Sequence, residues 1–324
     1  MSATQHHTLE IPPALSGNRL DAAVATLLSD YSRTSIKQWI EAGQLTLNGS
    51  VCVRPRTRVA DADQIEVIAT LAACENVAGE ALEFAIAYED AALIVVDKPA
   101  GLVVHPGAGN PTGTLVNGLI YRFPDLSALP RAGLVHRLDK ETSGLLLVAR
   151  TSATYHALVA QMARREIHRQ YIALVHGIMI SSGTIDAPMA RDRQQRTRMR
   201  VASAGRDAVT HYRIIKRFRA HTEVELTLET GRTHQIRVHM QHLGFPLVGD
   251  PTYGARRGLP PTATQALIKH LTALQRQALH ARRLAFVHPI SGQKITLRSP
   301  LPVDLQRLRR ALGDDTKRHQ GGHA

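Results

Sequence analysis

The stretch GLVHRLDKETSGLLLVAR, residues 133–150, joins a short charged segment to a wholly apolar run. The apolar part, LLLVA, has the length and composition of a buried strand. We therefore interpret DKETS as a loop held at the edge of a rigid sheet, with Gly144 allowing a close turn. In this loop Asp139 lies between Arg137 and Lys140. A surface ion pair would explain such an acid, but on an extended segment Arg137 and Asp139 point the same way, as two groups that face one ligand would.

The sequence around this stretch predicts an α+β fold. From residue 83 onward, strand-like runs such as ALIVVDKPAG and TEVELTLETG alternate irregularly with helix-like runs such as TLVNGLIYRF and RTHQIRVHMQHLG. Tight turns such as DKPAG and HPISG favour hairpins. Because strict alternation of strands and helices fails, we expect helices on a mostly antiparallel mixed sheet.

The amino-terminal part of the chain has the pattern of a separate small domain. NRLDAAVATLL and SRTSIKQWIEAG predict two short helices, with Ser32 as an N-cap and Gly43 as a C-terminal stop. Asn48-Gly49 within LTLNGSVCV predicts a hairpin. The predicted organisation is a flexible arm over residues 1–16, a small domain of two helices and a sheet over 17–75, a linker over 71–82, a larger domain over 83–312 and a disordered tail over 313–324.

The chain carries a strong excess of positive charge. Its 324 residues include 40 Lys and Arg against 27 Asp and Glu, a net charge of +13, which indicates a polyanionic partner such as nucleic acid. Fourteen Lys and Arg against four acids place +10 of this total between residues 150 and 219. The densest part, ARDRQQRTRMR, favours a phosphate-contacting loop over a merely solvated one. Its arginines are predicted to bind RNA: Arg191, Arg193, Arg196, Arg198 and Arg200.

Several familiar kinds of site do not fit the pattern. Two cysteines are too few for a disulfide framework or a cysteine-based zinc site, and His234, His239 and His242 lack metal-site spacing. HRLDK lacks the companion segments of a protein kinase, and GAGNPTGT lacks the lysine of a phosphate-binding loop. A glycosidase would need two carboxylates, and the near neighbour of Asp139 is Glu141 in the same loop. Chemistry with a single carboxylate remains.

The amino terminus and the hydropathy pattern bear on location. The start of the chain lacks the pattern of a signal peptide, and no apolar run approaches the ~20 residues of a membrane span. We therefore expect a cytoplasmic protein without membrane contact. We also expect a monomer, because no exposed apolar stripe stands out.

The first domain resembles the alpha-L RNA-binding domain of a ribosomal small-subunit protein, tyrosyl-tRNA synthetases and RNA-modifying enzymes. The matching segments are RLD, IKQWIEAGQLTLNG, VRPRTRV and DADQIEV. Arg33 and Lys37 lie one helical turn apart and can share a face, and Arg54, Arg56 and Arg58 alternate as on one strand face. RNA binding by these five residues is predicted, although residues 18–70 carry no net charge.

Most of residues 17–300 resembles the large-subunit ribosomal pseudouridine synthases. The opening stretch is similar to that family's signature, and VDKPAGLVVHPG, RQYIALVHG and LETGRTHQIRVHMQHLGFPLVGDPTYG also recur there. The resemblance implies that Asp139 is the catalytic acid, that Arg137 fills the stack when the base flips out, and that Tyr171 lies against the flipped base. It implies no cofactor and no metal. Asp139 would act by covalent addition or by taking a ribose proton, and the sequence leaves both routes open.

Arg232 is predicted to pair with Asp139. The strand VELTL runs into Thr230-Gly231, and Thr233 could cap the next helix, so Arg232 would project from a strand-to-helix turn into a cleft. The resembled family has an arginine paired with its catalytic acid. Such a pair would orient the carboxylate and favour its charged form.

The predicted partner is large-subunit ribosomal RNA or a ribosome precursor particle. FPLVGDPTYG and RQALHARRLAFVHPISG are most similar to the D-type members of the family, which modify neighbouring uridines of a stem-loop at the subunit interface. Two alternatives remain open at this level. One is a synthase acting on other ribosomal or transfer RNA sites, and the other is a catalytically silent RNA-binding or ribosome-assembly factor.

Overall fold

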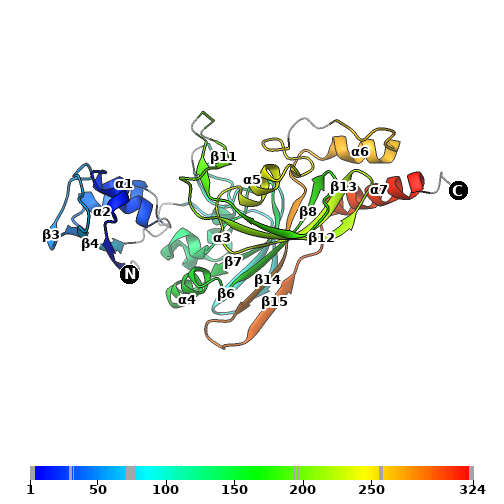
Figure 1. The fold of residues 1–324 in the computed structure, drawn as a ribbon. Coiled ribbons are helices and arrows are strands. Elements are labelled where there is room, and N and C mark those ends of the chain that lie inside the picture. Colours follow the sequence, from blue (N-terminus) through cyan, green and yellow to red (C-terminus); the bar gives the residue numbers. More distant parts are fainter. Residues whose placement is uncertain are drawn as a thin grey trace. The chain divides into compact units, whose positions relative to one another are not determined.

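The computed structural model describes residues 4–28, 31, 33–70, 77–107, 109–192, 194–195, 197–254 and 258–320. The chain divides into two compact units, one formed by residues 1–76 and 127–131 and the other by the remaining residues. Figure 1 labels the helices and strands of both units. No helix among the described residues is both long enough and apolar enough to cross a membrane.

The smaller unit packs two helices on a four-stranded antiparallel sheet. A 3-10 turn, η1 (Pro13–Leu15), precedes α1 (Leu20–Leu27) and α2 (Arg33–Glu41). The strands follow the order β1-β4-β2-β3, with β1 (Thr4–Glu10), β4 (Gln64–Thr70), β2 (Leu45–Leu47) and β3 (Ser50–Val51). The predicted hairpin is confirmed, because Asn48 and Gly49 both have positive φ and Leu47 pairs with Ser50.

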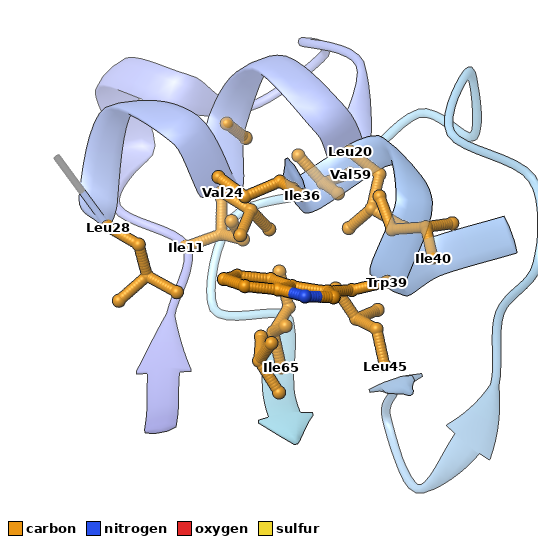
Figure 2. Packing of buried hydrophobic residues seen from close by; sticks show 12 residues of the cluster. Ile11, Leu20, Val24, Leu28, Ile36, Trp39, Ile40, Leu45, Val59 and Ile65 are labelled. Atoms are coloured by element: carbon orange, nitrogen blue, oxygen red, sulfur yellow. The ribbon is translucent and has the colours of Figure 1, made fainter. Parts of the chain in front are cut away.

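The core of this unit forms around one tryptophan. Figure 2 shows the Trp39 indole lying between helix residues such as Val24 and Ile36 and the strand residues Leu45 and Ile65. The four aliphatic residues are at most 1% exposed. Burial of this apolar surface is what lets such a short segment fold as a unit.

The predicted flexible arm is corrected by the structure. β1 pairs along its length with β4, and Ile11, which follows it, is fully buried in the core of the smaller unit. Residues 4–16 therefore belong to the small domain, because their backbone is needed to pair with the exposed edge of β4. The N-cap predicted at Ser32 lies outside the described residues.

The larger unit is built on a nine-stranded mixed sheet, which confirms the predicted α+β class. β7 (Ser143–Ala149) is buried along its whole length and pairs in parallel with β14 (Leu279–Val287), whereas the other described pairings of this sheet are antiparallel. The order is β5-β6-β7-β14-β8-β13-β12-β9, with β15 on β14. The remaining strands are β5 (Ala85–Glu89), β6 (Leu93–Lys98), β8 (His168–His176), β9 (Gly183–Asp186), β12 (Val209–Arg217), β13 (His221–Leu228) and β15 (Lys294–Arg298).

Helices and a separate hairpin surround this sheet. β10 (Met189–Arg191) and β11 (Met199–Val201) form a two-stranded ribbon of their own, which we call the arginine hairpin, residues 189–201. Helix α4 (Ser152–Ala163) contacts β7, α5 (Gln235–His242) contacts β11 and β12, and α6 (Gln265–Ala273) packs on α7 (Val303–Gln320) (Figure 1). The remaining helix of this unit is α3 (Leu115–Arg122); two 3-10 turns, η2 (Pro124–Ala128) and η3 (Arg131–Gly133), each have residues in both units.

The predicted disordered tail is also corrected. α7 continues to Gln320, with Leu312 1% exposed and Asp315 2% exposed. The Asp315 carboxylate accepts a hydrogen bond from Arg219 Nε at 2.9 Å. Residues 313–320 form a helix despite their polar composition, because one face is buried and Asp315 makes a partly buried ion pair with Arg219.

Candidate active site

Asp139 lies in the loop between η3 and the buried strand β7. Leu138 is 5% exposed, while Arg137 is exposed and the Asp139 side chain is 16% exposed. The alternation therefore turns Arg137 and Asp139 toward the accessible side, as predicted for an extended segment. Thr142 N donates to Asp139 O at 3.0 Å, which closes the loop into a turn just before β7.

A buried lysine at the end of β6 holds this loop in place. Lys98, at the end of β6, is fully buried, and its Nζ donates to the carbonyl oxygens of Pro99, Leu102 and Lys140 at 2.7, 2.9 and 2.9 Å. One side-chain nitrogen thus joins the turn after β6 to the residue that follows Asp139. Because Lys98 is the last residue of β6, these bonds fix the position of the Asp139 loop relative to the sheet.

The role expected of Gly144 is different in the structure. Its φ is +110°, and a Cβ at this position would collide with the Ala281 carbonyl of β14. Gly144 therefore permits the close parallel pairing of β7 with β14 rather than a turn. This pairing places the start of β7, and so the Asp139 loop, next to β14 and its neighbour β8.

The arginine that contacts Asp139 is Arg237 of α5, not Arg232. Arg237 Nη1 donates to Asp139 Oδ2 at 3.1 Å, and the Arg237 side chain is only 6% exposed. Asp139 Oδ1 accepts no hydrogen bond among the described residues. One oxygen of the carboxylate is thus held, and the other is available to react.

A second carboxylate holds Arg237 in turn. Asp250, with a fully buried side chain, accepts from Arg237 Nε at 2.7 Å and from Nη2 at 2.9 Å. Burial alone would raise the pKa of Asp250, but Arg237 and the backbone N–H groups of Thr252 and Tyr253 hold it below its ordinary value. The guanidinium is therefore fixed by a bidentate pair on one side and presented to Asp139 on the other.

Tyr253 connects this ion pair to the arginine hairpin. The Arg237 guanidinium lies 4.9 Å from the centroid of the Tyr253 ring, and that of Arg198 lies 5.2 Å from it. The Tyr253 hydroxyl accepts from Met199 N at 2.8 Å and hydrogen-bonds to His234 Nδ1 at 2.8 Å. One buried side chain thus contacts the hairpin, the start of α5 and the arginine of the site.

The prediction that Arg232 pairs with Asp139 is wrong. Arg232 Nε donates to the carbonyl of Asp207 at 3.1 Å, and its backbone N–H donates to Gln235 Oε1. Helix α5 begins only at Gln235, and its N-cap is His234 at φ +59° rather than Thr233. Because His234 has a left-handed conformation, the helix begins only after it. Arg232 therefore stays in the turn, and Arg237, on the helix, contacts Asp139.

Tyr171 lies on β8, paired with Leu226 of β13 and Ala281 of β14. It is 4% exposed. Burial raises the pKa of its hydroxyl; Arg169 acts in the opposite direction, and the Asp139 charge raises it further. The pairing of β8 with β14, and of β14 with β7, brings Tyr171 to the part of the sheet from which the Asp139 loop extends.

The structure places part of the predicted phosphate-contacting loop. Arg191 and Arg200 are exposed on the two strands of the arginine hairpin, and Arg198 stands over Tyr253. Arg193 and Arg196 lie outside the described residues. The hairpin presents its cations on one ribbon, a form suited to a polyanion.

The cations of the small domain have different surroundings. Arg33 donates to the buried carboxylate of Asp21 at 2.9 Å, and Lys37 lies 3.4 Å from Glu41. Arg54, Arg56 and Arg58 are exposed, but they lie on a turn with one isolated bridge, so the predicted shared strand face is wrong. Pro55 breaks the extended pattern.

Among the described residues no three His, Cys, Asp or Glu side chains are grouped to hold a metal ion.

Sequence reasoning missed Arg237, Asp250, Tyr253 and Lys98. A weak signal existed for Arg237 and Lys98, because a charged residue within the apolar part of a predicted helix or strand needs a buried partner. The partners could not be chosen, since Arg237 and Asp139 are 98 positions apart in the chain.

Lys98→Met is expected to remove one pH-dependent contribution to stability. Burial lowers the pKa of Lys98 to about 7 from its ordinary 10.5, although its three carbonyl acceptors suit the charged form. Between these values the unfolded chain holds a proton that the folded protein does not, so the Lys98 contribution to stability rises with pH. The free energy of unfolding of wild type minus that of the variant should therefore increase as the pH rises from about 7. Urea unfolding across this range measures it, and a flat or falling difference would count against the assignment.

Comparison with known proteins gives consistent matches. Residues 92–242 match the family described as RNA pseudouridylate synthase, and residues 18–65 match the S4 domain. The chain is 51% identical to Ribosomal large subunit pseudouridine synthase D of Xanthomonas campestris, over 95% of this chain and 93% of that protein. The protein of the same name from Pseudomonas aeruginosa is 48% identical, over 99% of this chain and 100% of its own length. Human RNA Pseudouridylate Synthase Domain Containing 4 superposes with a TM-score of 0.53 at 27% identity, over 69% of this chain and 92% of the human one.

Proposed function

Since the chain belongs to the family of RNA pseudouridine synthases, we propose that it converts specific uridines of large-subunit ribosomal RNA to pseudouridine. The relatives that match nearly the whole chain carry that substrate in their names. An S4 domain precedes the synthase domain, which is the predicted order of an RNA-binding module before a catalytic one. The finer proposal is that the target uridines neighbour one another in a single stem-loop at the subunit interface.

The proposed reaction breaks the carbon–nitrogen bond between uracil and ribose and makes a carbon–carbon bond between them, with no net loss of atoms. The N1–C1′ bond of uridine breaks, the uracil turns over, C5 bonds to C1′, the C5 proton leaves and N1 gains a proton. Asp139 supplies the single acid for this sequence, either by adding to C1′ or by taking and returning a ribose proton. The observation that carries this proposal is the carboxylate held at Oδ2 by Arg237 with Oδ1 left for the substrate.

The other residues are assigned by their positions. Arg137, exposed beside Asp139, would enter the space that the flipped nucleotide leaves, because an enzyme that works on a stacked base must take it out of the stack. Tyr171, buried on β8, would lie against the base. The exposed Arg54 and Arg56 of the small domain and Arg191 and Arg200 of the arginine hairpin would contact phosphates.

Mapping of pseudouridine in ribosomal and transfer RNA tests the substrate. Cells that lack this gene should show several neighbouring unmodified uridines in one stem-loop of the large-subunit RNA, most readily those already unpaired. The wild-type gene should restore the pseudouridines, and Asp139→Asn should not. Pseudouridines lost from transfer RNA, or from other large-subunit sites, would reject the stem-loop while leaving the reaction class in place.

A further inference from the structure

One buried arginine of the larger unit has no counter-charge among the residues that the structure describes. Arg169 lies on β8, two residues before Tyr171, and is 6% exposed. No ion pair or side-chain hydrogen bond of the described residues includes its guanidinium, and Nε is both buried and unpartnered. A buried charge without a partner is costly, so proteins rarely keep one without an anion to complete it.

The other buried arginines differ in this respect. Arg237 is held between Asp139 and Asp250, and Arg276 makes two bonds to Asp304, at 2.7 and 2.9 Å. Each thus has a carboxylate from the chain itself. The guanidinium of Arg169 is the exception among these three, and the missing anion must come from elsewhere.

Arg169 is directed toward the candidate active site. Side chains two apart on a strand share a face, so Arg169 and Tyr171 lie on the same side of β8. Tyr171 pairs with Ala281, which pairs in parallel with Gly144 at the start of β7, five residues after Asp139. Arg169 Nη1 lies close to Gly231, 3.0 Å from the position that a Cβ of this residue would occupy, and Gly231 precedes α5. The charge of Arg169 also acts on the pKa of Tyr171, against the dominant effect of burial.

We propose that Arg169 is a catalytic residue that binds a carbonyl oxygen of uracil while the base is detached from ribose. This inference rests on the proposed function. When the N1–C1′ bond breaks, its electron pair stays with the base, and the negative charge spreads over N1, O2 and O4. A guanidinium already fixed in a site from which water is largely excluded stabilises such charge without rearrangement. When C5 bonds to C1′ and N1 is protonated, the charge on the base disappears and the product can leave.

Uracil fits this position better than a phosphate does. Arg169 is nearly buried beside the tyrosine assigned to the base, whereas exposed cations such as Arg191 and Arg200 suit the RNA backbone. A phosphate contact would chiefly support binding, while a contact to the detached base would chiefly support the rate. The two therefore give different kinetics.

Arg169→Met and Arg169→Ala in the full chain test this inference on the stem-loop RNA. Single-turnover pseudouridine formation should fall by roughly 100-fold, as for loss of one fixed donor to a developing anion, with little change in RNA affinity. Guanidinium ion should restore part of the rate of Arg169→Ala, and urea of similar shape should not. Thermal unfolding establishes that the variants are folded, and the Met variant fills the space if the Ala variant does not fold.

Arg283→Ala is the matched control. Arg283 lies opposite Gln170 on β14, hence on the other face of the sheet, and its Nε is also buried without a partner. Its loss should leave the single-turnover rate unchanged. An Arg169 variant with a wild-type rate would overturn the inference. So would a variant that binds RNA more weakly, with a shallower dependence of affinity on salt, but reaches the full rate at saturating RNA, because this result would identify a phosphate contact. An inactive wild type in the same assay would overturn the proposed function, and this inference with it.

Discussion

Asp139→Asn is expected to abolish pseudouridine formation, by roughly 10³-fold or more, because it removes the carboxylate that we propose to react. The amide keeps the volume of the side chain, so the loop and its bond from Thr142 N should persist. RNA affinity should change little, since the predicted backbone contacts lie on other residues. Single-turnover assays at saturating RNA measure the rate, and filter binding measures the affinity.

Glu141→Gln is the matched control for this variant. Glu141 is the other acid of the same loop, and it makes no contact with Arg237 among the described residues. Its loss should leave the rate near that of wild type. If Asp139→Asn protein that is free of contaminating synthase turned over at the wild-type rate, the assignment of Asp139 would be wrong.

Arg237→Gln is expected to reduce both stability and activity. It leaves the fully buried Asp250 carboxylate without its bidentate partner, and breaking a buried pair by removing one member typically costs about 3–5 kcal/mol. It also removes the donor that orients Asp139. Arg237→Lys keeps the charge but cannot make the bidentate pair, so its loss should be intermediate.

Urea unfolding and single-turnover rates separate the two effects. Adding Asp250→Asn to Arg237→Gln removes the stranded charge and should recover part of the stability but none of the activity. Arg213→Gln, which breaks an exposed pair with Glu225, is the control and should cost no more than about 1 kcal/mol. A single Arg237→Gln variant as stable as the control would contradict the account of the pair.

Local patterns in the sequence determined the class of fold and the loop before β7 that holds Asp139. The apolar run of residues 145–149 lies in the buried strand β7, and Asn48-Gly49 forms the predicted hairpin. These predictions hold because they depend on side chains within a few residues of one another. The same local reasoning failed for residues 4–16 and 313–320, whose order depends on β4 and on Arg219, far away in the chain.

Only the tertiary structure decided which groups surround Asp139. Arg232 and Arg237 lie five positions apart in one segment, and the left-handed conformation of His234 sets the start of α5 so that Arg237 reaches the acid. Asp250 and Lys98 complete the site from two further segments. The partner of a buried charge depends on which opposite charge lies close to it and on the exclusion of water. Both conditions arise only when the chain is packed, so the sequence alone does not give them.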